Sequence, residues 1–338
     1  SRFDKGYYGQ WKLIREYFPS TDQPALIEKY SLINTGKNSL QVEIPEEQTR
    51  SKTNPENGVT GAYIMEGTVY GSGPHTVLPG DTLYFAASLS AHREGEPSIR
   101  LQPETEMDFL KQLADNLILE TPDPVINRMF AFSKIRACES IYETKGGPMH
   151  GPGGESYYAA IWANDQAEYI NPYFPFTGYA YGNASALNSF RHFARFMNDE
   201  WKPIPSSIIA EGLDIWNGAG DRGDAAMIAY GASRFALAGG DRQQAETLWP
   251  LIQWCLEYCH RKLTPEGVVA SDADELEGRF PAGKANLCTS SLYYDALISA
   301  AFLAKDLGKD KKTAATYRQQ AADLRKSIEK YFGGTVEG

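Results

Sequence analysis

Hydrophobic and polar residues alternate in short runs in the N-terminal part of the chain. The clearest runs cover residues 25–33, 40–44, 63–70 and 82–90. The runs end at turn residues, such as the Pro-Gly-Asp sequence at 79–81. An alternation with a period of two residues is that of a strand with one buried face. Short strands bounded by glycine and proline predict a β-sandwich over residues 1–103.

The hydrophobic period becomes that of helices after residue 104. Apolar residues recur at helical spacing and predict a linker helix over residues 104–121. The Pro-Asp-Pro sequence at 122–124 opens a second helix, because proline is favoured at the first helical position. Further helices are predicted over residues 183–199, 224–239, 241–261, 289–306 and 311–331.

Long glycine- and proline-rich loops separate the predicted helices, notably at residues 146–154 and 217–223. Loops of this length inside a compact domain are usually functional rather than connective. Helical hairpins with alternate long connections describe a toroid of antiparallel helix pairs with a site at one end, here over residues 122–338. Because no strands are predicted between these helices, there is no place for a nucleotide-binding parallel sheet.

Length and composition limit the classes of function. A chain of 338 residues exceeds the size at which one hydrophobic core usually stops growing, which favours two domains. The net charge is -10 and the 33 basic residues are scattered, which argues against a nucleic-acid partner. The 20 tyrosines and 6 tryptophans suit the stacking of sugar rings and an ordinary large core equally well.

Neither a membrane span nor a metal site is predicted. No run of about 18 apolar residues occurs, and if a signal peptide has been removed, a secreted or periplasmic location is favoured. Cys255 and Cys259 lie four residues apart beside His260, as metal ligands could. Buried small side chains on one helix face are the favoured interpretation, since no further ligands accompany them. No cofactor is predicted.

Carboxylates gather in a loop at residues 272–277. Asp274, Glu275 and Glu277 form the densest group, flanked by Asp272. Mutual repulsion in such a group can raise the pKa of one member into the range that an acid catalyst requires. The alternative is a solvated acidic loop, and the residues alone do not decide between the two.

A tryptophan, an amide and a carboxylate stand together in the sequence Trp-Ala-Asn-Asp. Asp165 follows Trp162 at a predicted helix N-terminus, where it acts either as a cap or as a ligand. A tryptophan beside a carboxylate favours the ligand interpretation, because the ring stacks on a sugar while the carboxylate holds its hydroxyls. We therefore predict that Trp162, Asn164 and Asp165 form the floor of a sugar pocket, supported by Glu168.

Four other residues are candidates in the remaining loops. Asp224 is either a helix cap or a ligand for hydroxyls, and Arg222 is either its partner or a donor to substrate. Trp216 and His150 are expected to line the cleft. For His150, local hydrogen bonding is the favoured interpretation.

Three segments of the chain resemble the six-hairpin glycosidases, whose (α/α)6 toroid often follows an N-terminal β-sandwich. The sequence Trp-Ala-Asn-Asp-Gln-Ala at 162–167 is similar to the tryptophan-to-aspartate segment of bacterial α-L-rhamnosidases and glucoamylases. Residues 220–241 are similar to the Gly-Asp-Ala helix start of rhamnosidases and to its Gly-Asp end. Residues 272–278 look like the acidic loop of the same enzymes, and the helices that follow extend the resemblance, which covers residues 122–332.

The chain departs from the resembled enzymes at two places. Glucoamylase-like enzymes have arginine where Asn164 stands. Rhamnosidases carry an Asp-Glu-Arg run before the tryptophan, where this chain has Glu155 followed by Ser-Tyr-Tyr. The resemblance therefore makes Glu155 a further candidate for the acid.

The resemblance implies a glycoside hydrolase acting on oligo- or polysaccharides, in which a protonated carboxyl serves the leaving oxygen and a carboxylate lies opposite. An inverting course is favoured, because acids rather than histidines populate the loops. Glu275 is ranked ahead of Glu277 and Asp274 as the proton donor.

Two other functions stay open. A polysaccharide lyase on a similar toroid would use His150 with Tyr157 or Tyr158 as its base. A carbohydrate-binding protein would keep the pocket without turnover.

The number of helices gives a last expectation. A six-hairpin toroid needs twelve helices, and the pattern predicts about seven in these residues. The catalytic base is then expected outside them, on a later hairpin of the resembled enzymes. The helices at 289–306 and 311–331 are expected to keep partly bare apolar faces, which a second chain or a missing C-terminal segment would cover.

Overall fold

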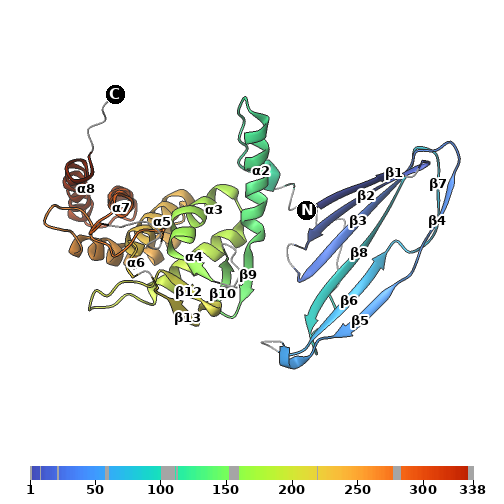
Figure 1. Ribbon diagram of the computed structural model, residues 1–338, viewed down its shortest axis with the longest axis horizontal. Coiled ribbons are helices and arrows are strands. Elements are labelled where there is room, and N and C mark those ends of the chain that lie inside the picture. Colours follow the sequence, from blue (N-terminus) through green and yellow to red (C-terminus); the bar gives the residue numbers. More distant parts are fainter. Residues whose placement is uncertain are drawn as a thin grey trace. The chain divides into compact units, whose positions relative to one another are not determined.

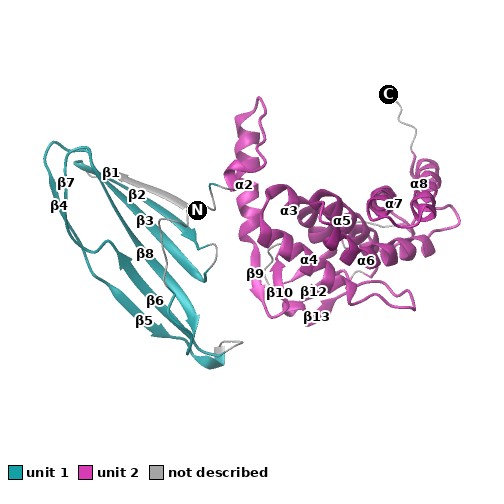
Figure 2. Ribbon diagram, turned by 180° about the vertical axis from the view of Figure 1, so that it is seen from behind, with its two compact units in different colours: residues 1–112 teal, residues 113–338 magenta. Residues whose placement is uncertain are grey.

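The computed structural model describes residues 2–7, 9–20, 23–57, 61–99, 111, 113–151, 160–218, 220–276 and 283–333. The chain divides into two compact units, residues 1–112 and 113–338, which we describe separately (Figure 2). The first unit consists of strands and the second mainly of helices (Figure 1). The predicted succession of a β-rich part and a helical part is confirmed.

The first unit is built on a six-stranded antiparallel sheet with the strand order β1-β2-β3-β8-β6-β5. These strands are β1 (Arg2–Tyr7), β2 (Trp11–Pro19), β3 (Ala25–Asn34), β5 (Gln48–Lys52), β6 (Tyr63–Tyr70) and β8 (Thr82–Arg93). A 3-10 helix, η1 (Pro55–Asn57), precedes β6. The strands β4 (Leu40–Ile44) and β7 (Gly73–Val77) pair into a separate ribbon.

Cross-strand pairs of large side chains stabilise this sheet. Phe18 on β2 and Ile27 on β3 are register partners, and both are buried in the core of the unit, where Tyr70 packs against them. Tyr30 and Phe85 are also register partners, and their rings stack with centroids 4.5 Å apart. Such pairs explain why these alternating sequences form neighbouring strands.

The helices of the second unit are α2 (Pro124–Glu139), α3 (Asn171–Thr177), α4 (Ala180–Ala194), α5 (Asp224–Gly239), α6 (Arg242–Arg261), α7 (Leu287–Asp306) and α8 (Lys311–Phe332). They agree with the prediction except for α3, which the sequence analysis did not predict. The helix predicted over 183–199 is α4, which ends earlier. Asn198 forms hydrogen bonds to the backbone of Lys202 instead, and these close a turn where the helix was expected to continue.

Side-chain caps fix where several helices begin. Asp123 accepts a hydrogen bond from the backbone N–H of Val125 at 2.8 Å, ahead of the proline that starts α2. Asp241, Asn286 and Asp310 cap α6, α7 and α8 in the same way. Each cap satisfies an amide that has no partner within its own helix.

Helix α5 lies at the centre of the second unit, in contact with α3, α6, α7 and the π-helix η2 (Asn164–Ile170). A Cβ atom on Gly231 of α5 would lie 1.9 Å from the carbonyl oxygen of Ala167 in η2. Only glycine therefore allows the two backbones to approach so closely. This contact sets the position of η2, which carries several predicted site residues.

The expectation that no strands occur among the helices is wrong. β9 (Ile141–Thr144) and β10 (Gly147–His150) form a hairpin. β11 (Ile161–Trp162), β12 (Ser207–Ile209) and β13 (Asp214–Trp216) form a three-stranded sheet, and η3 (Ala210–Gly212) connects its last two strands. These strands have two to four residues, too few for an alternating pattern to show in the sequence. All their pairings are antiparallel, which is unlike a nucleotide-binding parallel sheet.

Of the linker helix predicted over 104–121, residues 104–110 and 112 lie outside the described residues; residues 111 and 113–115 are helical, and residues 116–121 are not, so the helix ends earlier than predicted. At its C-terminal end, the buried Lys134 of α2 donates hydrogen bonds from Nζ to the carbonyl oxygens of Leu113 at 2.7 Å and Ala114 at 3.1 Å, and to that of Asn116. Burial lowers the pKa of Lys134. The ammonium group thus fastens this segment to α2.

We expect Lys134→Met to lower the free energy of unfolding by about 2–3 kcal/mol, because one buried and two part-buried carbonyl groups lose a charged donor. Urea unfolding followed by circular dichroism measures the change. Lys326→Met is the control, since that side chain is 78% exposed and its loss should stay within about 0.5 kcal/mol. Equal stability losses in the two variants would contradict the fastening role.

By length and composition alone, helix α7 could cross a membrane, and no other helix among the described residues meets this test. However, 56% of its most apolar window is buried inside the second unit. Its apolar residues pack against α5 and α8, as those of a core helix do.

Candidate active site

Three segments singled out in the sequence meet where η2, α5 and α7 begin. The loop before α5 is bonded to the acidic loop, because the Asp221 N–H donates to Asp272 Oδ2 at 3.0 Å and the Asp272 N–H donates to the Asp221 carbonyl oxygen at 2.7 Å. The hydroxyl of Tyr169 on η2 donates to Oε2 of Glu275 at 3.3 Å. The acidic loop is thereby joined to both other segments.

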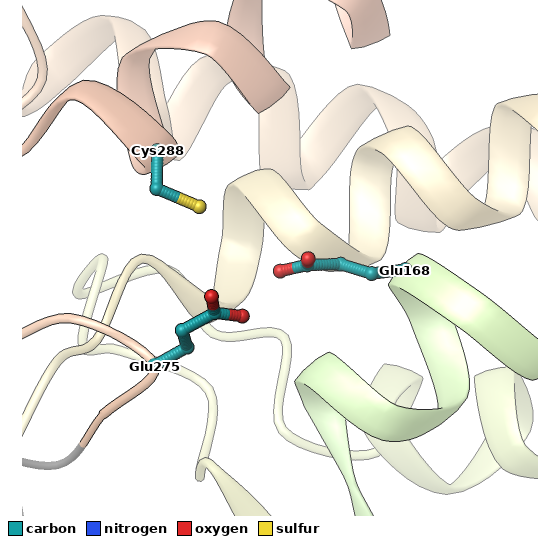
Figure 3. Close-up of side chains that lie close together, drawn as sticks. All are labelled: Glu168, Glu275 and Cys288. Carbon is teal, nitrogen blue, oxygen red and sulfur yellow. The ribbon is translucent and has the colours of Figure 1, made fainter.

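Glu168, Glu275 and Cys288 face one another at this junction (Figure 3). Glu168 lies on η2, Glu275 in the acidic loop, and Cys288 in the first turn of α7. One oxygen of each glutamate and the Sγ atom of Cys288 all lie within 4.8 Å of one another. All three side chains are half-buried.

Burial and charge raise the pKa of the Glu168 carboxyl to about 7. Loss of solvation is the largest cause and the charge of Glu275 is the second, while a hydrogen bond from Tyr169 and the charge of Arg222 act in the opposite direction. Oε1 of Glu168 is buried and has no hydrogen-bond partner among the described residues. This carboxyl therefore keeps its proton to a higher pH than an ordinary glutamate does.

Among the described residues, Glu168, Glu275 and Cys288 form the one cluster of side chains close enough together to hold a metal ion. Two carboxylates and a thiolate are ligands that zinc accepts. Here, however, burial and the nearby carboxylates raise the pKa of the Cys288 thiol to about 12. Without a metal ion, the sulfur therefore keeps its proton at neutral pH.

The remaining candidate acids are placed less centrally or lie outside the described residues. Asp274 accepts a hydrogen bond from the Leu276 N–H at 2.9 Å and so closes a turn within the acidic loop. Glu277 and Glu155 lie outside the described residues. Of the two predicted acids that the structure describes, Glu275 is the one that clusters with Glu168 and Cys288.

Arg222 and Asp224 form a buried ion pair. Asp224 accepts hydrogen bonds from the Ser206 hydroxyl at 2.8 Å and the Arg222 N–H at 3.2 Å, and its Oδ1 lies 3.4 Å from a guanidinium nitrogen of Arg222. Burial raises the pKa of Asp224 to about 6, although Arg222 opposes this. Both residues are 1% exposed, so neither is placed to touch a substrate, contrary to the predicted substrate contacts. Each buried charge instead needs the other as its partner.

Trp162 and Trp216 lie on one face of the three-stranded sheet. Both are register partners of Ser207, and directly opposed residues of antiparallel strands point to the same side. The two strands that carry them lie about 10 Å apart, with β12 between them. Both indoles are half-buried, as a stacking surface at the edge of a pocket would be.

Asn164 and Asp165 are the first residues of η2, directly after the sheet strand that carries Trp162. Both are half-buried. Oδ1 of Asn164 is buried and has no hydrogen-bond partner within the described part of the chain. The structure thus leaves this acceptor without a partner among the residues that it describes.

His150, Cys255 and Cys259 lie in the protein interior. His150 ends β10 and is 9% exposed, and its backbone oxygen accepts a hydrogen bond from the Gln166 side chain at 2.6 Å. Burial lowers the pKa of His150 to about 4. Tyr157 and Tyr158, its suggested partners in a lyase, lie outside the described residues. Cys255 and Cys259 are buried side chains of α6, as the favoured interpretation has it.

The sequence gives Glu168 a supporting role and does not single out Cys288. The available signal for Glu168 is its spacing, since it follows Asn164 by four residues and therefore lies one helical turn along the same segment. Cys288 carries no comparable signal, because its neighbours in space come from distant parts of the sequence.

No protein-family profile matches the chain, and no curated protein matches its sequence. Among solved structures, the chain is similar to a bacterial glucoamylase complexed with acarbose, with 12% identity over 95% of this chain and 55% of that one and a TM-score of 0.45. It is similar to a rhamnosidase from Klebsiella oxytoca with rhamnose bound, with 11% identity over 97% of this chain and 63% of that one and a TM-score of 0.45. A family 105 glycoside hydrolase of C. acetobutylicum is 12% identical over 61% of this chain and 57% of that one, with a TM-score of 0.44.

These structures include both groups that the sequence resemblance names, rhamnosidases and glucoamylases. The chain spans between 55% and 63% of the length of the three proteins. At TM-scores below 0.5, the likenesses carry no weight for the activity of this chain.

Proposed function

We propose that the chain is a glycoside hydrolase, or the part of one that carries the proton donor. The observation that supports this most directly is the half-buried pair of Glu168 and Glu275, in which the pKa of Glu168 is raised to about 7. Hydrolysis of a glycosidic bond needs such a group to protonate the leaving oxygen. The geometry favours Glu168 as the donor, in place of Glu275, which ranks first in the sequence.

Glu275 has a different role in this proposal. Two carboxyl groups that interact closely release their protons in two separate steps, so the first to ionise makes the second retain its proton. After burial, the charge of Glu275 contributes most to the raised pKa of Glu168, and the Tyr169 hydroxyl holds Glu275 in place. Glu168 and Glu275 thus act as one acid unit.

The separation of the two carboxyl groups bears on the stereochemical course. In inverting enzymes the acid and the base are about 6.5–9.5 Å apart, which leaves room for a water molecule. The closest oxygens of Glu168 and Glu275 lie within 4.8 Å of one another. The inverting course therefore requires a base other than Glu275, in keeping with the expectation of a base on a later hairpin. Proton NMR of the first sugar anomer released should show inversion.

The proposal includes the finer features of the sequence interpretation. We further propose a β-sandwich over residues 1–103, which the antiparallel six-stranded sheet and the separate β4-β7 ribbon support. We assign the helix pairs between 122 and 338 to an (α/α)6 toroid. Carbohydrate is the substrate, held by Trp162, Asn164, Asp165 and Trp216.

A screen of aryl glycosides tests the proposed activity. We expect hydrolysis of at least one of them, with kcat falling as the pH rises above about 7, because Glu168 must carry its proton to act and loses it there. Binding of sugar without product would favour a carbohydrate-binding protein. A product absorbing as an unsaturated uronide would favour a lyase.

Asp165→Asn tests the pocket floor. The change keeps the size of the side chain and removes its charge, so we expect affinity for the bound sugar to fall roughly tenfold, the loss of about one charged hydrogen bond. The melting temperature should stay nearly unchanged. A large drop in melting temperature without a specific loss of binding would instead identify Asp165 as a helix cap.

A further inference from the structure

A buried tyrosine of α6 makes a short hydrogen bond to the loop before α5. The Tyr258 hydroxyl donates to Oδ2 of Asp221 at 2.5 Å. Tyr258 is 3% exposed, and burial together with the charge of Asp221 raises the pKa of its phenol well above the ordinary value. The phenol therefore keeps its proton and remains a donor throughout the pH range of ordinary enzyme assays.

Asp221 uses its other polar atoms to hold two further segments. Oδ1 accepts a hydrogen bond from the Gly223 N–H at 2.9 Å, at the start of α5. The carbonyl oxygen accepts from the N–H groups of Asp272 at 2.7 Å and Ala273 at 3.2 Å. The Asp221 N–H returns a hydrogen bond to Asp272 Oδ2 at 3.0 Å. Asp221 thus links α6, the start of α5 and the acidic loop.

Stacked rings hold Tyr258 in position. Trp254, one turn earlier on α6, stacks on its ring with centroids 5.3 Å apart and an interplanar angle of 20°. Trp201 stacks on Trp254 in turn, with centroids 5.4 Å apart. The indole N–H of Trp254 donates to the carbonyl oxygen of Asn198 at 3.0 Å. The hydroxyl is therefore presented to Asp221 from a rigid support.

We propose that Tyr258 is a positioning residue that fixes the acidic loop through Asp221, and so holds Glu275 against Glu168. Glu275 follows Ala273 by two residues, so a loop released at Asp272 and Ala273 is free to carry Glu275 away. The catalytic meaning of this role rests on the proposed function. The structural part of the proposal, that Tyr258 keeps Glu275 close to Glu168, holds whether or not the protein is a glycoside hydrolase.

The test is Tyr258→Phe, which keeps the stacked ring and removes the hydroxyl. The reporter is the pKa of Glu168, measured by NMR titration of carboxyl-labelled glutamate. The groups that face Glu168 are Asp165 and Tyr169 on its own helix, Arg222 before α5, Glu275 in the acidic loop, and Cys288 on α7. Of these, Glu275 raises the pKa of Glu168 most. If Glu275 retreats, this pKa should fall by about half a unit or more.

Tyr293→Phe is the matched control. Tyr293 is also buried, at 1% exposure, and its hydroxyl has no hydrogen-bond partner among the described residues. We expect Tyr258→Phe to shift the pKa of Glu168 and Tyr293→Phe to leave it unchanged. Asp221→Asn is the second test variant and should reproduce the shift if Tyr258→Phe does not fold.

Activity gives a second measurement where the wild-type protein hydrolyses an aryl glycoside. Tyr258→Phe should then lower kcat by roughly 10-fold to 100-fold, the usual cost of a displaced catalytic group. The alkaline limb of its pH profile should move to lower pH together with the pKa of Glu168. An unchanged pKa in both Tyr258→Phe and Asp221→Asn would overturn the positioning role. Absence of hydrolysis by the wild type would count against the proposed function alone.

Discussion

Glu168→Gln should lower kcat on aryl glycosides with poor leaving groups by about 10²–10⁴-fold, the usual contribution of general acid catalysis. The change keeps the shape of the side chain and removes the proton that the leaving oxygen needs. The melting temperature should not fall, because the variant removes a half-buried carboxyl whose ionised form is poorly solvated. Initial rates and a thermal melt measure the two effects.

The leaving group makes this prediction specific. A substrate whose leaving group departs without protonation should be cleaved by Glu168→Gln at a rate much closer to that of the wild type. Glu329→Gln is the control, since that side chain is 63% exposed on α8 and should leave both rates unchanged. If Glu168→Gln cleaves good and poor substrates with equal losses, Glu168 is not the proton donor.

Local patterns account for the success of the helix predictions. The bounds of α5 agree with the predicted range of 224–239 because apolar residues fill its buried face and glycine follows its last turn. The start of α2 was predictable from Asp123 and the proline after it. Capping and periodicity act over a few residues, which is why one sequence reveals them.

The arrangement of the site depends on contacts that a local pattern does not contain. Glu168 and Glu275 meet although they are far apart in the sequence, because Gly231 lets η2 approach α5 and Asp221 ties the acidic loop to the start of that helix. The acidic composition of the loop predicted a raised pKa within it. The structure shows a raised pKa at Glu168, whose burial comes from the packing of η2 and which the loop composition does not reveal.

The sequence also could not predict whether Arg222 and Asp224 are exposed or buried. A Gly-Asp-Arg-Gly-Asp run in a loop is compatible with a ligand site and with a buried ion pair. Contacts with Ser206, the residue before β12, favour the buried ion pair. Its hydroxyl donates to Asp224, and its carbonyl oxygen accepts from the Arg222 guanidinium. The sequence therefore singled out Arg222 and Asp224, but it did not predict that they are buried.

Asp224→Ala should lower the free energy of unfolding by about 3–5 kcal/mol near neutral pH, the usual cost of leaving a buried charge without its partner. The variant deprives the Arg222 guanidinium of its counter-ion and the Ser206 hydroxyl of its acceptor. Burial raises the pKa of Asp224 from 3.8 to about 6, so the stability that this carboxyl contributes is greatest below pH 3.8 and declines as the pH rises through 6. Urea unfolding at pH 5 and pH 7 should therefore show a larger difference between wild type and variant at pH 5. A variant as stable as the wild type at both values, with weaker binding of sugar, would instead make Asp224 a ligand for substrate hydroxyls.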